Sequence, residues 1–326
     1  MASRRWPVGT VRSVSAFPNR SQTRSALDLE SVTWTAPVWH RVLSYYFSIQ
    51  ASDDLLASYV DTVIGMFVVD RDLSEEHNPP TPGVPVRYRL IDLGPDQEPQ
   101  FRLYYNDAII AGSGNAGFVF DQLFWHINAE CARFSGDFVL IHAGAVATPA
   151  GEGVLVPGAS GTGKSTLVVG LIREGFSYYS DEAAAIDPIG RRLHAYPKAI
   201  TLKDRAVFEE YTDIHPAHSD NAYVRNRWYV VPSRYRRDVV GSPCEVGFVF
   251  VSRYSPGAPT SVQRITQAEA GFALGRNVIN IGRYGPRVLP LLSDLVDGTT
   301  CYSIESGNLR EAVAAITKVT GVSPRS

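Results

Sequence analysis

The stretch from Gly158 to Ser165 reads GASGTGKS and fills every constrained position of the pattern G-x-x-x-x-G-K-[ST]. Glycines at this spacing let the backbone turn its N–H groups inward around phosphate oxygens, while the lysine reaches the β- and γ-phosphates and the serine hydroxyl can ligate Mg²⁺. A short apolar run, residues 153–157, precedes the stretch, and an apolar helical segment, residues 166–174, follows it. The motif requires this order of strand, loop and helix, so the sequence predicts a loop that binds a nucleoside triphosphate.

A chance match to this pattern is expected in roughly one chain in a hundred of this length. The pattern reads phosphates and not the base, so ATP is the expected ligand while another nucleotide stays open. The residues predicted to contact the nucleotide are Gly158, Ala159, Ser160, Gly161, Thr162, Gly163, Lys164, Ser165 and Thr166.

Composition restricts the class of protein. The 326 residues are 44% hydrophobic, enough for a sizeable core, and the net charge of -2 gives no global attraction to nucleic acid or to an anionic membrane. Neither a membrane span of about 18 apolar residues nor a secretory signal is recognisable. Cys131, Cys244 and Cys301 are scattered and odd in number, which favours a reducing compartment. We therefore expect a globular cytoplasmic protein without nucleic acid or membrane as partner, with a homo-oligomer left open.

Three segments follow one another along the chain. Residues 1–30 carry five arginines among Ser, Thr and Pro and are predicted to form a mobile basic tail, with a partner-docking arm as the alternative. Residues 31–135 combine strand-like runs with two helical patterns, which indicates a small α+β region. Residues 136–326 begin with short consecutive strands around the loop. The expected fold class is therefore α/β to α+β, with a mixed sheet in the third segment.

An acidic pair follows the loop. Asp181 ends a strand-like run, residues 176–181, and Glu182 follows it directly. Phosphoryl transfer to a hydroxyl needs a Mg²⁺ ligand and a group that takes the hydroxyl proton, and these two acids can supply both. If the helix after the loop crosses over between the two strands, the strand that carries Asp181 should lie beside the strand that enters the loop. The alternative is a solvated pair of acids at a strand end.

Taken together, three stretches resemble the catalytic domain of HPr serine kinase/phosphorylase, a phosphate-loop kinase of the phosphoenolpyruvate-carboxykinase type. They are the run Ile141 to Ala147, the loop itself and the strand end Ser180-Asp181-Glu182. The turn with Gly151 and Gly153 and the helix stop Glu174-Gly175 belong to the same resemblance. The resemblance covers residues 140–190. It implies a kinase domain with a mixed sheet over residues 136–326.

The resemblance also implies individual roles. His142 would lie near the transferred phosphoryl group, Lys164 and Ser165 would hold phosphates and Mg²⁺, and Asp181 would be the general base, with Glu182 as the second acid of the pair. Thr166 stands where the family usually carries an acid, so the chain looks more like stand-alone relatives, some of which phosphorylate Ser on precursor peptides, as in lasso-peptide pathways. A Pro-Lys segment and a later Arg recur in those relatives. They imply three residues that bind anionic groups of the substrate: Lys198, Lys203 and Arg253.

The expected function is an ATP- and Mg²⁺-dependent kinase that transfers the γ-phosphoryl group to a Ser hydroxyl of a peptide or protein. Lys164, His142 and Asp181 are its predicted catalytic residues, and Ser165, Asp181 and Glu182 its predicted metal ligands. Two alternatives stay open. One is a kinase for a small-molecule hydroxyl, and the other is a nucleotide-sensing regulatory protein without catalysis.

Overall fold

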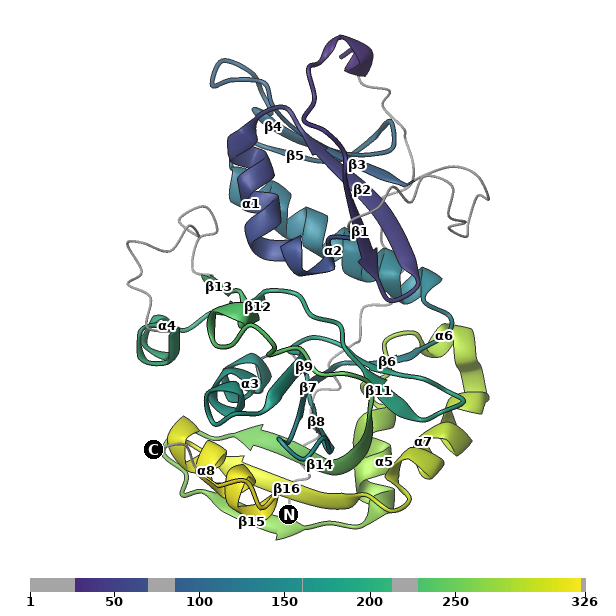
Figure 1. The fold of residues 1–326 in the computed structure, drawn as a ribbon, viewed down its shortest axis with the longest axis vertical. Coiled ribbons are helices and arrows are strands. Elements are labelled where there is room, and N and C mark those ends of the chain that lie inside the picture. The colour runs from purple at the N-terminus through teal and green to yellow at the C-terminus, as the bar shows by residue number, and fades with distance from the viewer. Residues whose placement is uncertain (1–26, 70–85, 160, 213–227, 324–326) are drawn as a thin grey trace, which may run out of the picture.

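The computed structural model describes residues 27–69, 86–159, 161–212 and 228–323. The chain forms two regions stacked along the long axis of the molecule, each with its own sheet (Figure 1). Most of the predicted basic tail and Ser160 of the loop lie outside the described residues.

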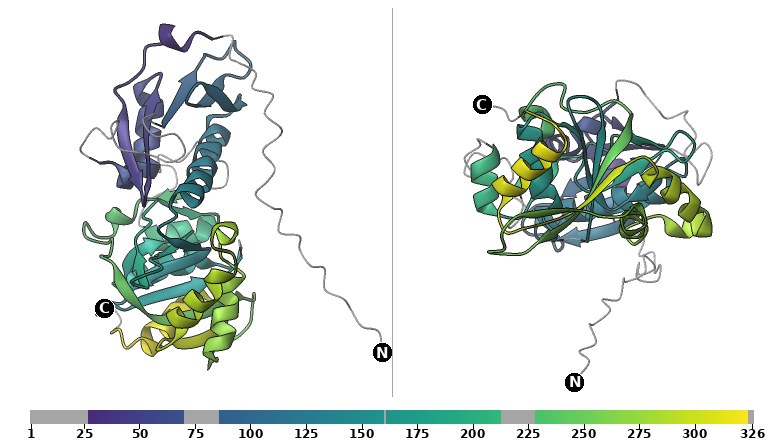
Figure 2. Two further views of the ribbon diagram at one scale, coloured as in Figure 1. Left: turned by 90° about the vertical axis from the view of Figure 1, so that its right-hand side faces the viewer. Right: turned by 90° about the horizontal axis from the view of Figure 1, so that it is seen from below.

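The N-terminal region is a five-stranded sheet in the order β1-β2-β3-β4-β5, parallel only between β2 and β3. Two helices pack on one face of this sheet and share a core of buried apolar side chains with it. Its elements are η1 (Leu29–Ser31), β1 (Val38–Val42), β2 (Tyr45–Ala51), α1 (Asp54–Ile64), η2 (Gly65–Phe67), β3 (Arg87–Asp92), β4 (Phe101–Tyr105), β5 (Ala108–Ser113) and α2 (Ala116–Phe134). In the side view of Figure 2, α2 runs from the five-stranded sheet down toward the second region.

Two buried histidines should make the N-terminal region sensitive to acid. Burial lowers the pKa of His40 and of His126 from 6.5 to about 4. Below pH 6.5 the two imidazole rings become protonated in the unfolded chain but stay neutral in the folded chain. The free energy of unfolding is therefore highest above that pH and decreases as the pH falls toward about 4. A His40→Phe variant keeps the ring stacked on Phe47 and should lose about half of this pH dependence. Urea unfolding at several pH values checks this, and equal slopes for the two proteins would contradict it.

Within the described residues, the second region is built on a mixed sheet of nine strands. Seven of them follow the order β6-β10-β11-β14-β8-β7-β9, and the other two branch off at β14, with β16 paired to β14 and β15 paired to β16. The long strand β14 runs parallel to β8 and to β16, and the remaining pairs are antiparallel. This confirms the predicted mixed α/β architecture. The strands are β6 (Val139–Ile141), β7 (Ala143–Ala147), β8 (Gly153–Pro157), β9 (Ser177–Ser180), β10 (Ala184–Ile186), β11 (Arg192–His194), β14 (Cys244–Tyr254), β15 (Ser261–Arg264) and β16 (Thr300–Ser306), with a separate pair of β12 (Ile200–Leu202) and β13 (Trp228–Val230).

Helices cover both faces of this sheet. Along β8, Val154 and Val156 pack in the core with α3 and α8, whereas Leu155 packs in the core with α5 and α7. This alternation explains why the strand reads as an unbroken apolar run. The helices are α3 (Lys164–Arg173), α4 (Arg205–Thr212), α5 (Gln267–Gly275), α6 (Ile281–Tyr284), α7 (Val288–Val296) and α8 (Leu309–Val319), with η4 (Pro232–Arg234) and η5 (Gly285–Arg287) between them. Throughout the part of the chain that the structure describes, helices of the length and apolar character needed to cross a bilayer are absent.

The strand order corrects one prediction. The strand that leads to Asp181, β9, does not lie beside the loop strand β8, because β7 lies between them and pairs antiparallel with both. The chain enters β8 directly from β7 through a tight turn, so the hairpin partner occupies the neighbouring position. Helix α3 therefore crosses over β7, and Gly144 permits the close approach, since a Cβ there would come within 2.8 Å of Val168 Cγ2.

Candidate nucleotide and phosphoryl-transfer site

The loop from Gly158 to Ser165 joins β8 to α3, as the sequence predicts. Gly161 and Gly163 have φ values of 89° and 85°, the left-handed region in which a Cβ is unfavourable. Gly158 has a different reason, because a Cβ there would come within 2.6 Å of Thr162 Oγ1. Gly163 is also the N-cap of α3, so the unpaired N–H groups and the positive end of the helix dipole lie at the loop. This local geometry suits an anion.

The Lys164 side chain lies against the loop backbone. Its Nζ donates to the carbonyl oxygen of Ala159 at 2.7 Å, and the Thr162 hydroxyl donates to the same oxygen at 2.9 Å. Burial lowers the pKa of Lys164, and the carboxylates of Glu182 and Asp181 oppose that shift. The ammonium group is therefore positioned by the loop that it is predicted to serve.

Asp181 is the centre of a buried hydrogen-bond network. Its Oδ2 accepts the Ser165 hydroxyl at 2.8 Å and the Thr201 N–H at 3.3 Å. Its Oδ1 accepts the Lys198 ammonium at 2.8 Å and lies 3.2 Å from the Tyr178 hydroxyl, whose single proton is shared between this oxygen and the Lys198 carbonyl at 2.9 Å. The side chains of Asp181 and Lys198 are only 1% and 5% exposed, so their charges depend on each other for compensation.

His142 and Glu182 form the more open side of the site. His142 Nδ1 lies 2.9 Å from the Glu182 backbone oxygen and 3.8 Å from its Oε1. Burial, followed by the positive charge of Lys164, lowers the pKa of His142. A neutral ring that faces a carbonyl oxygen through Nδ1 carries its proton there, so Nε2 is left with a free lone pair. The Glu182 side chain is 41% exposed.

The three predicted metal ligands are only partly brought together. Ser165 and Asp181 are in direct contact, whereas the Glu182 carboxylate lies near His142 and 4.0 Å from Lys198 Nζ. A hydroxyl and a carboxylate fit Mg²⁺, which prefers oxygen ligands and takes the rest from phosphates and water. No cluster of three or more His, Cys, Asp or Glu suited to a metal occurs among the described residues.

A cavity of about 360 Å³ adjoins the loop. One wall is Gly161 to Gly163 with Thr166, and the opposite walls are Ser252 to Tyr254 at the end of β14 and Ser306 to Leu309 at the start of α8. The Ser252 hydroxyl is buried without a hydrogen-bond partner in the described part of the chain, and Tyr254 is 58% exposed. The cavity can therefore receive the nucleoside of a nucleotide whose phosphates lie on the loop.

Sequence reasoning missed most of the cavity residues, because they come from segments about 90 and 145 positions after the loop. Apart from the loop residues Gly161 to Gly163, only Thr166 and Arg253 of its lining were predicted as site residues. Asn308 stands three residues before Glu311, a spacing that signals the start of a helix, and it caps α8 by accepting the Glu311 N–H. That signal concerned a helix end and not a ligand.

The three predicted substrate residues lie in different environments. Lys198 is buried in the ion pair with Asp181. Lys203 is exposed, and its charge contributes to the lowered pKa of Lys164. Arg253 lines the cavity beside the loop, with its side chain 76% exposed and its Nε 3.8 Å from Glu305 Oε1. Two of the three are thus accessible, and Lys198 has a structural partner.

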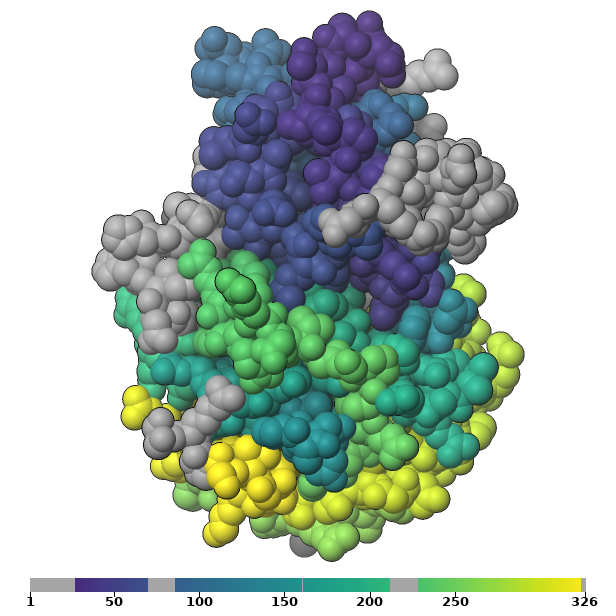
Figure 3. Space-filling view, in the orientation of Figure 1, coloured from purple at the N-terminus to yellow at the C-terminus, as the bar shows by residue number. Residues whose placement is uncertain are grey.

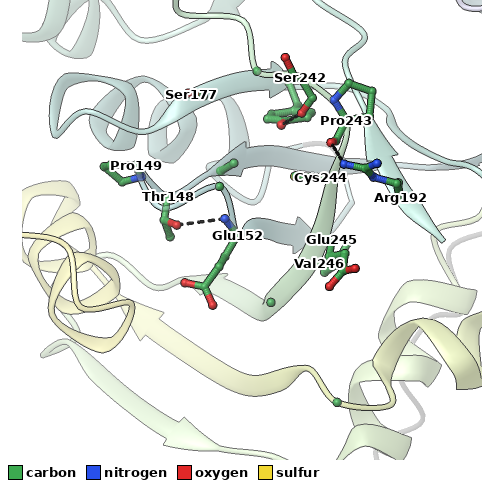
Figure 4. Close-up of a pocket in the computed structure, with 16 residues that line it drawn as sticks. Thr148, Pro149, Glu152, Ser177, Arg192, Ser242, Pro243, Cys244, Glu245 and Val246 are labelled. Carbon is green, nitrogen blue, oxygen red and sulfur yellow. Dashed lines mark hydrogen bonds between the residues drawn. The ribbon is translucent and has the colours of Figure 1, made fainter. Parts of the chain in front are cut away.

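A larger cavity of about 630 Å³ lies at the other end of β8, between the turn at Thr148 to Glu152 and the start of β14 (Figure 4). Four glycines contribute to its lining, and its charged side chains, Glu152, Arg192 and Glu245, do not converge on one point. Arg192 donates to the Pro243 carbonyl, and the Glu152 N–H donates to the Thr148 hydroxyl. The buried ion pair of Asp181 and Lys198 lies beside the phosphate loop instead, and buried charges of this kind mark a candidate chemical site.

No protein-family model matches the chain, and none of the curated proteins matches it either. The resemblance noted in the sequence therefore stays a prediction, and a functional assignment has to be argued from the site.

Proposed function

We propose that this protein is an ATP- and Mg²⁺-dependent kinase of the HPr-kinase-like type that transfers the γ-phosphoryl group to a hydroxyl, most suitably the Ser of a peptide or protein. The observation that carries the proposal is the contact of Ser165 with Asp181, 2.8 Å apart and backed by the buried Lys198. It joins the phosphate loop to an acid from a different strand. Phosphate-loop enzymes need this combination to hold Mg²⁺ next to the phosphates.

Each group then has a role. The N–H groups at the start of α3 and the Lys164 ammonium neutralise the β- and γ-phosphates. Ser165 and Asp181 would hold Mg²⁺, which supplies further positive charge there. The acceptor oxygen forms a bond to the γ-phosphorus while the bond from that phosphorus to the β,γ-bridging oxygen breaks, so ADP leaves. The proton of the acceptor hydroxyl passes to a carboxylate of the acidic pair.

Two carboxylates compete for that proton. Asp181 is the proposed base, but its two oxygens already face four donors, of which Tyr178 also bonds to the Lys198 carbonyl, so one donor has to turn away before a proton can be received. Glu182 is more exposed and lies beside His142. It is the second candidate, and an acceptor that approaches it comes from the solvent side.

The proposal is tested by incubating the protein with ATP, Mg²⁺ and a panel of Ser-containing peptides, followed by intact-mass measurement. We expect one added phosphate on Ser, and a Lys164→Met variant should add none because it lacks the charge that neutralises the phosphates. A phosphorylated metabolite from a small-molecule panel would favour the alternative kinase. ATP binding without any transfer would favour the regulatory protein.

A further inference from the structure

The segment from Tyr196 to Leu202, here called the strap, belongs to both regions of the molecule. Tyr196 and Ala199 are buried in the core cluster of the N-terminal region. Lys198, between them in sequence, points to Asp181 and is 4% exposed. Neighbouring side chains of one short segment are therefore fixed by different parts of the protein.

One set of contacts attaches the start of the strap to α1, η2 and α2. The Tyr196 hydroxyl donates to Asn128 Oδ1 on α2, and the Tyr196 ring stacks on Phe67 with centroids 5.6 Å apart. The Ala199 N–H donates to the Val63 carbonyl on α1 at 3.1 Å. These contacts lie on both sides of Lys198, so they fix the backbone from which its side chain reaches Asp181.

A second set attaches the end of the strap to α2 through β13. The Tyr229 hydroxyl donates to Asp121 Oδ1 at 3.1 Å, and the Tyr229 ring stacks on Phe124 at 5.4 Å. Tyr229 pairs with Thr201 in the two-stranded sheet. Thr201 is the residue whose N–H donates to Asp181 Oδ2. The space-filling view shows residues of this part of the chain, in green, directly beneath the purple and blue N-terminal region (Figure 3).

We propose that the N-terminal region is a positioning element of the phosphoryl-transfer site: through the strap, α1 and α2 hold Lys198 and Thr201 against Asp181. Two of the four donors to Asp181 come from the strap. The proposal rests on the proposed function and extends it, because it gives the N-terminal region a part in the reaction. Tyr196, Asn128 and Tyr229 act through other residues and are positioning residues.

Weakening the strap contacts should lower kcat and leave the binding of ATP unchanged. The phosphate loop is supported by the core that contains α3 and α8. Tyr196 and Tyr229 do not belong to that core, because both side chains are buried in the core of the N-terminal region. Loosening these two tyrosines should therefore change the position of Asp181 and spare the binding of ATP. Misplacement of a reacting group by about 1 Å lowers turnover up to a hundredfold, so we expect kcat to fall on the order of tenfold with KM for ATP unchanged.

The experiment uses the full chain with Tyr196→Phe and Tyr229→Phe combined, which removes two hydroxyls and keeps both rings. Asn128→Leu, which removes the acceptor instead, is the second variant. Tyr105→Phe is the matched control, because that hydroxyl bonds to Glu130 within the N-terminal region. Hydrogen exchange is measured over residues 196–202 and over β8 as an internal reference. Titration with ATP and Mg²⁺ and turnover with an acceptor peptide from the mass assay follow.

In the double variant and in Asn128→Leu we expect faster hydrogen exchange over residues 196–202 and a lower kcat. Exchange in β8 and the affinity for ATP should stay the same. Tyr105→Phe should behave like the wild-type protein in all four measurements. Unchanged exchange over the strap would overturn the proposal, and so would faster exchange with wild-type turnover. A wild-type chain that transfers no phosphate would refute the proposed function instead. The exchange result would then still decide whether the N-terminal region holds the strap.

Discussion

Replacing Asp181 with Asn should lower kcat for phosphoryl transfer by about a thousandfold, within the range for loss of a proton-accepting group, while ATP still binds. Asp181 is in contact with both the phosphate loop, through Ser165, and the strap, through Lys198. An amide in its place cannot accept a proton and is a poor Mg²⁺ ligand. The loop glycines, Lys164 and the cavity beside the loop stay intact, so nucleotide affinity is spared. Rapid-quench turnover and calorimetric titration with ATP measure the two quantities.

The matched control is Asp187→Asn in the same region, where the carboxylate accepts the Ile189 N–H in a turn. An amide oxygen can replace it there, so turnover should not change. A separate Glu182→Gln variant identifies the base. A comparable loss of kcat in that variant would assign the proton to Glu182 and leave Asp181 with Ser165 and the metal. Wild-type turnover in Asp181→Asn would contradict the proposed function itself.

The parts of the site that the sequence could predict are local in the chain. The loop, the strand before it and the helix after it depend on residues 153–174, and their spacing and glycines determine the local backbone. Ser165 and Asp181 were predicted to share a metal ion, and their side chains are in contact although β7 was not expected between the strands. They meet because the ends of β8 and β9 lie at the same edge of the sheet.

The other parts depend on tertiary contacts between distant segments. A lysine in Tyr-Pro-Lys-Ala has no pattern that distinguishes a solvated charge from a buried counter-ion, and only its burial against Asp181 in the folded chain shows that Lys198 is the latter. The cavity beside the loop combines the end of β14 with the start of α8. Neither segment carries a ligand-binding motif, because the cavity there depends on its shape and on the buried Ser252 hydroxyl. No local pattern could have joined them.

Replacing Lys198 with Met should destabilise the protein by about 3 kcal/mol, because it leaves the Asp181 carboxylate buried without its counter-ion. This lies at the lower end of the range for a broken buried ion pair, since Ser165, Tyr178 and Thr201 still donate to the carboxylate. Lys203→Met is the matched control. It makes the same chemical change at an exposed lysine directly after the strap and should alter the free energy of unfolding by less than about 0.5 kcal/mol.

The combination of Lys198→Met with Asp181→Asn separates charge pairing from packing. If the two charges stabilise the fold chiefly by compensating each other, removal of both eliminates the uncompensated charge, and the double variant should recover most of the stability that either single variant loses. Urea unfolding of the four proteins measures this coupling. Turnover should stay as low as in Asp181→Asn, because restored stability does not restore the carboxylate. Strictly additive losses would show that Lys198 contributes through packing of its side chain, and that the buried pair is not what holds the strap against Asp181.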